Sequence, residues 1–290
     1  MNKIGESELI INSDGSVFHL HIKPEELADT VILVGDPGRV EMVSSFFESK
    51  EFSKQSREFA SCTGRYNGKR ITVLSTGIGT DNIDIVMNEL DALVNIDFKT
   101  REIKKEKKSL TLLRIGTSGS VQEDIPVGTY VFSRKSVGFD GLLNWYADRD
   151  KYTIADIEEA FVEHMSWDKH LPRPYIIKAD DSLANLFAPV SVKGMTISAT
   201  GFYGPQGRIL RLGLAMPDFM KKLISFKYGD DRITNIEMES SALAGLAAEL
   251  GHKAGTICLI IADRFHKKGN ADYKTMMNGL IKTALDKLSQ

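Results

Sequence analysis

Short apolar runs, each bounded by glycine or by polar residues, recur along this chain and alternate with longer stretches of helical periodicity. The runs typical of buried strands lie at residues 31–34, 71–74, 111–115, 128–132, 195–200 and 256–262. The stretches typical of helices lie at residues 37–47, 83–94, 240–251 and 272–288. Strands that alternate with helices in this way predict an α/β fold, with a central sheet flanked by helices.

Local signals mark several of the element boundaries. Asp36 is a favourable N-cap and Pro37 a favourable first helical residue, so a helix is expected to begin there. The dipeptide at residues 67–68, Asn-Gly, predicts a tight hairpin turn before the strand at residues 71–74. Gly251 follows an alanine- and leucine-rich run and predicts the end of that helix.

Three segments are less regular. Residues 17–22 alternate in polarity, which predicts a strand with His19 and His21 on one face. Because the sequence offers no third ligand, we favour a histidine that reaches a ligand hydroxyl, or a surface histidine, over a metal pair. The lysine-rich residues 99–108 predict a solvated excursion, and residues 140–174, with mixed signals, could form a lid or a partner surface.

Composition narrows the class of protein. The 290 residues are 42% hydrophobic without a break in composition, so we expect one domain spanning residues 1–290. A net charge of −2 argues against binding of nucleic acid or of an anionic membrane by bulk electrostatics. Residues 1–15 are polar, and no apolar run reaches membrane-spanning length. Cys62 and Cys258 have neither disulfide-framework nor zinc spacing, which favours a cytoplasmic location.

An arginine inside the run at residues 111–115 is followed at once by two glycines and two hydroxyl residues. Arg114 offers a rigid cationic fork, and Gly116 and Gly119 let backbone N–H groups approach a ligand. The hydroxyls of Thr117 and Ser118 can donate. The pattern predicts that the strand ends here in an oxyanion pocket; a buried arginine paired with a carboxylate beside a tight turn is the alternative.

Two other glycine-containing segments follow strand-type runs. At residues 35–40 a helix begins with Arg39 in its first turn, where the helix dipole disfavours a cation, so a bound anion or a neighbouring carboxylate is expected. Residues 75–82 contain Gly77 and Gly79 but lack the third glycine of the dinucleotide fingerprint and the lysine of a P-loop. We therefore expect both segments to line one cleft at the carboxyl ends of the strands.

The loop at residues 201–208 follows a strand-type run and is rich in glycine. A planar heterocycle can stack on Phe202, while the Gln206 amide reads a donor–acceptor edge and Arg208 meets a carbonyl oxygen. An ordinary loop with an anchored aromatic residue is the alternative. At residues 237–239 two carboxylates begin a helix, where they complement its dipole or hold the vicinal diol of a ribose.

Arginines near the expected cleft together suggest a phosphate-sized anion: Arg39, Arg57 and Arg114. Five motifs occur in order over most of the chain: GDPGRV (35–40), REF (57–59), STGIG (75–79), RIGTSG (114–119) and EMES (237–240). Together they resemble the nucleoside phosphorylase family of purine and uridine phosphorylases. The loop FYGPQGR (202–208) resembles the uracil-binding loop of uridine phosphorylases. The resemblance implies a mixed, distorted barrel-like sheet flanked by helices.

The resemblance also implies roles at matching positions. The phosphate residues would be Gly35, Arg39, Arg114 and Thr117, with Arg57 from a neighbouring subunit. The ribose residues would be Met238, Glu239 and His19, the last reaching the 5′-hydroxyl across the same interface. The base residues would be Ser118, Phe202, Gln206, Arg208 and Arg264. A monovalent cation such as K⁺ would lie between subunits at Glu58, Ile78 and Asn82, although Asn82 replaces the usual serine.

The implied activity is reversible phosphorolysis of uridine to uracil and ribose 1-phosphate, without an organic cofactor. Arg114, Gln206 and Arg208 would act on the reacting groups, and the enzyme would be a dimer or a hexamer with shared active sites. Asp263 lies near the position of the acid in purine-specific relatives. We favour an ion pair with Arg264, and a purine or mixed-specificity phosphorylase, a hydrolytic nucleosidase and an inactive nucleoside sensor remain as alternatives.

Overall fold

A closed, mixed β-barrel forms one half of the molecule in the computed structural model, which describes residues 3–269 and 272–290. The barrel strands are β7 (Thr111–Ser120), β8 (Tyr130–Gly138), β10 (Val192–Ser198), β12 (Asp231–Glu237) and β13 (Lys253–Asp263). They pair in the order β12-β10-β8-β13-β7, and β12 also pairs with β7. That last pairing closes the ring and confirms the barrel-like sheet expected from the resemblance.

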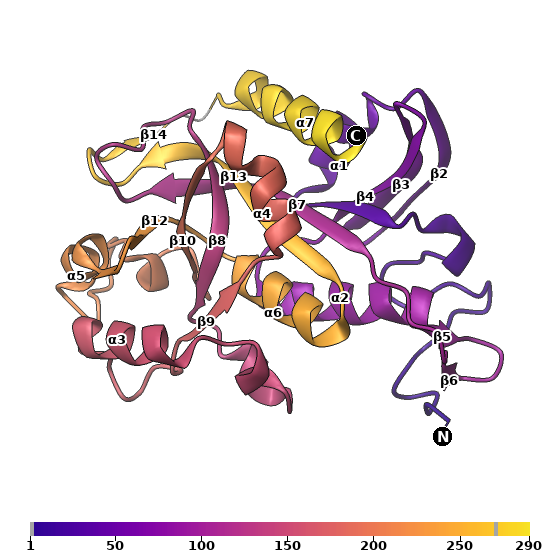
Figure 1. The fold of residues 1–290 in the computed structure, drawn as a ribbon, viewed down its shortest axis with the longest axis horizontal. Coiled ribbons are helices and arrows are strands. Elements are labelled where there is room, and N and C mark those ends of the chain that lie inside the picture. The colour runs from indigo at the N-terminus through magenta and orange to yellow at the C-terminus, as the bar shows by residue number, and fades with distance from the viewer. Residues whose placement is uncertain (1–2, 270–271) are drawn as a thin grey trace.

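The other half of the sheet extends from β7. Its strands are β1 (Thr30–Val34), β4 (Lys69–Ser75), β3 (Phe59–Tyr66) and β2 (Ser49–Ser56). Strand β1 runs parallel to both β7 and β4, so these strands present their carboxyl ends at the same edge. Figure 1 shows the barrel strands β7 and β13 between the other barrel strands and this extension.

Helices cover both faces of the sheet (Figure 1). The α-helices are α1 (Pro37–Ser44), α2 (Thr80–Asn95), α3 (Ala155–Met165), α4 (Asp181–Phe187), α5 (Phe219–Ser225), α6 (Ser240–Leu250) and α7 (Lys274–Leu288). Helices α2 and α6 share one core, α1, α4 and α7 a second, and α3 and α5 a third. The short strands are β5 (Ile96–Asp97), β6 (Glu102–Ile103), β9 (Tyr175–Lys178), β11 (Lys227–Tyr228) and β14 (Lys268–Gly269).

Strand β1 explains why the central runs are apolar without alternation. Val31 and Leu33 pack into the core that contains α2 and α6, whereas Ile32 and Val34 pack into the core that contains α1 and α7. A strand covered by helices on both faces needs apolar residues at every position. The prediction of a sheet between two helical layers is thereby confirmed.

The boundary signals are confirmed with small shifts. The Asp36 carboxylate accepts a hydrogen bond from the Gly38 N–H, and α1 ends at Ser44, three residues before the expected end. Asn67 and Gly68, at φ 48° and 74°, join β3 to β4. Positive φ at both turn residues is what a two-residue hairpin requires.

The strand predicted at residues 17–22 is wrong. The segment is a turn in which the His21 N–H bonds the Val17 carbonyl and the Val17 N–H bonds the Ile22 carbonyl. His21 has φ 53°, so the two histidines do not share a strand face. Alternating polarity over six residues does not distinguish a strand from a compact turn with apolar anchors at its ends.

The predicted strand break after Ile115 is also wrong. Strand β7 continues to Ser120, and its glycine-containing half pairs with β13 on one side and with β12 on the other. Glycine is depleted from strands, but the closure of the barrel brings other strands close to this segment. The hydroxyl residues therefore lie on a rigid strand instead of a flexible turn.

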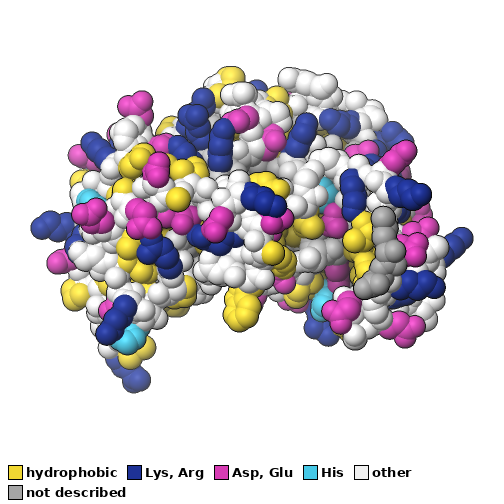
Figure 2. Space-filling view, turned by 60° about the horizontal axis from the view of Figure 1, so that its bottom comes forward, with side chains coloured by type: hydrophobic (Ala, Val, Ile, Leu, Met, Phe, Trp, Pro, Cys, Tyr) yellow, Lys and Arg dark blue, Asp and Glu magenta, His cyan; other side chains and the backbone are white. Residues whose placement is uncertain are grey.

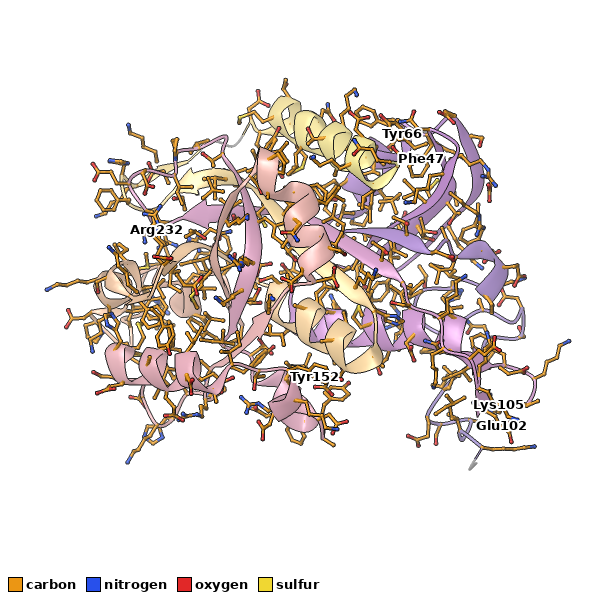
Figure 3. All side chains as sticks on the ribbon, viewed as in Figure 1. Phe47, Tyr66, Glu102, Lys105, Tyr152 and Arg232 are labelled. Atoms are coloured by element: carbon orange, nitrogen blue, oxygen red, sulfur yellow. The ribbon has the colours of Figure 1, made fainter. Side chains whose placement is uncertain are left out.

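The segments that the sequence placed least well lie at the periphery. Residues 99–108 are mostly exposed, and Figure 3 shows Glu102 and Lys105 at the opposite end of the molecule from Arg232 on the barrel. Residues 140–174 contain α3 and two 3-10 helices, Leu142–Trp145 and Arg149–Lys151. On the face drawn in Figure 2, basic and acidic side chains are interspersed. None of the described helices has the length and apolar character to cross a membrane.

Candidate active site

A cavity of about 280 Å³ opens where the carboxyl ends of β1 and β12 and the second half of β7 meet the loop after β10. Its walls contain most of the residues selected from the sequence: Gly35, Arg39, Ile78, Arg114, Thr117, Ser118, Phe202, Gln206, Arg208, Met238 and Glu239. Segments far apart in the chain thus supply one site. The expectation of a shared cleft at the strand ends is confirmed.

Arg114 is the central charged residue of this cavity. Its guanidinium is buried, with Nη1 3.3 Å from Glu237 Oε2 and Nη2 bonded to Glu239 Oε2. A Cβ atom at Gly116 would lie 2.3 Å from Arg114 Nη1, so glycine is required for the arginine to lie against its own strand. Arg114 Nε has no partner among the described residues. The carboxylate-pair interpretation is confirmed, and because the paired arginine also lines the cavity, the oxyanion pocket stays a prediction.

Glu237 fixes the start of α6. Its carboxylate accepts bonds from the backbone N–H of Glu239 and of Ser240 at 3.0 Å and from the Ser240 hydroxyl at 2.6 Å. Burial raises the pKa of Glu237 to about 7, against the lowering effect of Arg114 and with a further rise from Glu239. Glu237 is therefore within reach of protonation near neutral pH.

Glu239 links the cavity to the loop after β4. Its Oε1 accepts the Gly79 N–H at 2.8 Å while Oε2 meets Arg114. Glu239 is 3% exposed, so both oxygens are held inside the protein. These contacts orient the carboxylate before any ligand is bound.

The first turn of α1 supplies a second arginine. Arg39 is 6% exposed and its Nη1 lies 3.4 Å from the Ile115 carbonyl, a long contact for a guanidinium donor. Gly35 lies beside it, and a Cβ atom at Gly35 would be 3.8 Å from Arg114 Nη2. Two buried guanidinium groups near a helix N-terminus make this end of the cavity suited to an anion.

The loop after β10 builds the opposite end. The Arg208 guanidinium lies 3.8 Å from the Phe202 ring centroid and donates to the Phe202 carbonyl at 2.7 Å and to Gln206 Oε1. Gln206 is buried, whereas Phe202 is 51% exposed. Burial and the nearby charge of Arg264 lower the pKa of Arg208 to about 10.

Arg264 follows the end of β13 and does not line the cavity directly. Its side chain passes Gly119, where an added Cβ atom would lie 3.2 Å from Arg264 Cγ. Burial lowers the pKa of Arg264, and its Nη1 is buried without a hydrogen-bond partner in the described part of the chain. The Arg264 guanidinium, next to the cavity wall at Gly119, therefore has a donor that no described residue uses.

Three wall residues carry no signal in the sequence: Ile236, Ile261 and Ala262, whereas Asp36, Gly119 and Glu237 belong to the motifs selected from it. Ile261 and Ala262 lie near the end of strand β13, where the register against β7 shifts between Ile260 and Ala262. A bulge of this kind re-aims side chains, and no residue type in an apolar run signals it.

Five selected residues lie outside the cavity wall: His19, Arg57, Glu58, Asn82 and Arg264. His19 Nδ1 is 2.6 Å from the Glu89 carboxylate on α2. Arg57 is exposed in the turn between β2 and β3 at φ 53°. Arg57 is thus exposed, whereas His19 is partly buried against α2.

The residues selected for a cation do come together around Gly77. A Cβ atom there would lie 2.4 Å from Asn82 Nδ2 and 3.1 Å from Glu58 Cγ. The Asn82 amide is 3.4 Å from the Ile78 carbonyl. The three positions are therefore neighbours at the loop that precedes α2.

The expected ion pair between Asp263 and Arg264 is wrong. Asp263 instead accepts bonds from the His266 backbone N–H at 2.9 Å and from His266 Nδ1 at 2.7 Å. Burial acts to raise the pKa of Asp263, but the bonds from His266 outweigh it, so the pKa is lowered. Strand β13 ends at Asp263 and a turn begins at Arg264, so the two side chains have different surroundings.

An arginine–carboxylate cluster lies beside an aromatic loop at the strand ends of this mixed barrel, in agreement with the resemblance of the motifs to nucleoside phosphorylases. The chain belongs to the phosphorylase superfamily, because the model of that family matches residues 29–285. The family suggested by the five motifs is thereby confirmed.

Relatives with assigned activities cover nearly the whole chain. A uridine phosphorylase of Thermococcus kodakarensis is 29% identical over 97% of this chain and 91% of its own length. A DeoD-type purine nucleoside phosphorylase of Bacillus subtilis is 27% identical over 94% of this chain and 99% of its own. The crystal structure of a Trypanosoma brucei nucleoside phosphorylase, described as showing uridine phosphorylase activity, is 31% identical with a TM-score of 0.87, covering 97% and 99% of the two chains.

Proposed function

We propose that this protein is a uridine phosphorylase, which converts uridine and inorganic phosphate reversibly into uracil and ribose 1-phosphate. The observation that carries the proposal is the contact of Gln206, Arg208 and Phe202 in the cavity that also contains Arg39 and Arg114. One end of the cavity suits a planar base and the other an anion. The similarity to the proteins of Thermococcus kodakarensis and Trypanosoma brucei supports this proposal.

The base end matches the edge of uracil. A uracil ring offers an N–H donor between two carbonyl acceptors, and an amide beside a guanidinium offers the complementary acceptor and donors. Arg208 bonds Gln206 Oε1, which orients the amide with its NH₂ group away from Arg208. Phe202 and Ser118 then border the ring, and Arg264 adds positive charge behind Arg208.

The anion end positions the nucleophile. Arg39, Arg114, Gly35 and Thr117 hold phosphate, and Met238 and Glu239 hold the ribose between phosphate and base. The C1′–N1 bond loosens to an oxocarbenium-like ribosyl centre, and a phosphate oxygen forms the new bond to C1′. Positioning of two reactants is worth about 7–11 kcal/mol in favourable systems. Arg208 and Gln206 stabilise the negative charge that develops on the departing uracil.

We also propose that a second subunit completes this site. Arg57 is exposed and the His19 side chain is 29% exposed, so both can reach the phosphate and the 5′-hydroxyl of a neighbour. A monovalent cation, bound near Glu58, Ile78 and Asn82, belongs to the same interface. The reaction needs no organic cofactor. A role in pyrimidine salvage or catabolism in the cytoplasm fits two buried cysteines that form no disulfide in the described residues.

The deciding experiment measures free base released from uridine and from inosine, each with and without inorganic phosphate, together with ribose 1-phosphate. Phosphate-dependent cleavage of uridine alone supports the proposal. Cleavage of inosine would favour a purine or mixed-specificity enzyme, and base release without phosphate a hydrolytic nucleosidase. Binding of uridine without turnover would favour a sensor protein. The two bonds from His266 disfavour the purine alternative, because they hold the Asp263 carboxylate against its own turn.

A further inference from the structure

A chain of buried hydrogen bonds connects the interior of the barrel to the cavity. Its members are hydroxyl and amide side chains from four different barrel strands, each at most 5% exposed. The links are Ser133 to Thr196 at 2.7 Å, Thr196 to Asn235 at 2.8 Å and Asn235 to Ser118 at 2.8 Å. Of these four residues, only Ser118 lines the cavity.

The placement of the Asn235 amide, with Oδ1 toward Thr196 and Nδ2 toward Ser118, sets the direction of each hydrogen in this chain. An amide oxygen only accepts and an amide NH₂ group only donates. Asn235 Oδ1 therefore accepts from Thr196, and lies 2.9 Å from the Thr234 hydroxyl, while Asn235 Nδ2 donates to Ser118 Oγ. Because the Thr196 hydrogen is used on Asn235, Ser133 must donate to Thr196.

The local backbone makes room for this arrangement. Strand β10 has a register shift at Gly194–Met195 against β8 and at Met195–Thr196 against β12. A Cβ atom at Gly194 would lie 2.1 Å from Thr234 Cγ2. The irregular strand and the missing side chain let Thr234 and Thr196 converge on the Asn235 amide.

These bonds restrict where the Ser118 hydroxyl hydrogen can point. Its oxygen already accepts from Asn235, so its single hydrogen must point elsewhere. The Cys258 thiol lies close to Ser118, and sulfur is a weak acceptor. A carbonyl or hydroxyl oxygen of a molecule in the cavity is the stronger acceptor for that hydrogen.

We propose that Asn235 is a positioning residue that makes Ser118 a hydrogen-bond donor into the cavity, toward an oxygen acceptor of the bound nucleoside. The acceptor class is a base carbonyl or a ribose hydroxyl. This inference rests on the proposed function, since it assigns a partner for the substrate of the same site. The inference goes beyond the proposed function because it names a residue, Asn235, that does not line the cavity.

The test is a double-mutant cycle on uridine phosphorolysis. Asn235→Asp replaces the donor facing Ser118 by an acceptor, so the Ser118 hydrogen turns toward the carboxylate and away from the cavity. We expect KM for uridine to rise about tenfold, with kcat and KM for phosphate changed less than about threefold. Ser118→Ala should cost a similar factor. Asn235→Asp in the Ser118→Ala background should then add less than about twofold.

Ser133→Ala is the matched control. It removes an equally buried hydrogen bond at the far end of the chain but leaves Thr196 able to donate to Asn235. Its stability should fall while KM for uridine stays unchanged. If Asn235→Asp does not fold, Thr196→Val, which removes one donor from Asn235 Oδ1, replaces it and should give a smaller rise in KM that again disappears in the Ser118→Ala background.

Equal costs of the Asn235 substitution in both backgrounds would overturn the inference, because the residue would then act without Ser118. A rise in KM for Ser133→Ala would overturn it as well, since loss of packing would suffice. The proposed function fails separately, by the wild-type assay alone. If the wild type cleaves inosine, the same cycle is measured with inosine. If it turns over neither, the cycle is measured by calorimetric titration with uridine, and equal heats for all variants would reject the inference.

Discussion

The two ends of the cavity are built differently. At the anion end, Arg114, Glu237 and Glu239 are each at most 4% exposed and are bonded to one another and to the start of α6. At the base end, Phe202 is half exposed and Arg208 bonds the carbonyl and the amide of its own loop. The first end belongs to barrel strands and the second to a loop between β10 and α5.

The difference indicates a division of labour. Rigid, mutually bonded charges suit the step that every substrate shares, which is the capture of phosphate and ribose. A loop whose polar groups are satisfied by each other must exchange those bonds for bonds to the base, so small changes of loop sequence can alter the preferred base. Substitutions at the anion end should therefore affect folding and catalysis together, and substitutions at the base end catalysis alone.

The largest effect is expected for Arg114→Ala. The change removes a phosphate ligand and leaves two buried carboxylates without their cation, a loss that typically costs about 3–5 kcal/mol of stability. Turnover with uridine should fall by at least about 10³-fold. Urea unfolding and kcat/KM on the same preparations measure both losses. The exposed pair Arg232–Asp124 supplies the control, since Arg232→Ala should change neither by more than about 0.5 kcal/mol.

Unchanged stability of Arg114→Ala would show that the two carboxylates do not depend on this cation. The anion end would then be no more rigid than the base end. A drop in stability with nearly normal turnover would separate the cluster from catalysis altogether.

Arg208→Ala should give the next largest effect and sharpen the contrast. Loss of one donor to a developing charge costs about 10²–10³-fold in kcat, while the free energy of unfolding should change by less than about 1 kcal/mol. Arg211→Ala, in the exposed part of the same loop, is the matched control and should keep full activity. Full activity of Arg208→Ala would remove this arginine from the reaction.

The sequence predicted residues at both ends of the cavity, and what it missed has a physical reason. Gly116, Arg114 and Glu239 are specified by close contacts between backbone and side chains, and such contacts leave residue types that a motif can carry. The wall residues Ile261 and Ala262 enter the cavity through a shift in strand register, which leaves no trace in residue type. The partner of Asp263 is local: the turn after β13 brings the backbone N–H and the ring of His266, three residues on, back to the carboxylate.

The raised pKa of Glu237 predicts a pH dependence of stability. The folded state keeps the Glu237 proton up to about pH 7, whereas the ordinary pKa is 4.5, so the unfolded state binds fewer protons between these values. Stability should therefore fall as pH rises through this window, by an amount on the order of a few kcal/mol. Glu237→Gln cannot titrate, so the stability difference between wild type and variant should change between about pH 5 and about pH 7.

Urea unfolding at both pH values measures that difference, and exposed Glu123→Gln serves as the control, with profiles parallel to the wild type. Parallel profiles for Glu237→Gln as well would mean that the carboxylate stays ionised in the folded state. The arginine would then outweigh burial, and the anion end would carry one more negative charge than proposed.

The smallest effect on kcat/KM for uridine is expected for substitution of Asp263, and a small effect would support a structural role for this carboxylate. Asp263 lies behind the base end, bonded to His266, so Asp263→Asn should keep kcat/KM for uridine within about threefold, because an amide oxygen still accepts one of the two bonds from His266. His266→Ala is the paired variant and should act through the same contact.

Measured with uridine and with inosine, the two variants distinguish a structural role of the Asp263 carboxylate from a catalytic one. A structural Asp263 makes both substitutions equally mild with uridine and leaves inosine uncleaved. If the wild type cleaves inosine and Asp263→Asn alone abolishes that activity, Asp263 donates a proton to a purine, and the base end, not the anion end, has been assigned to the wrong substrate.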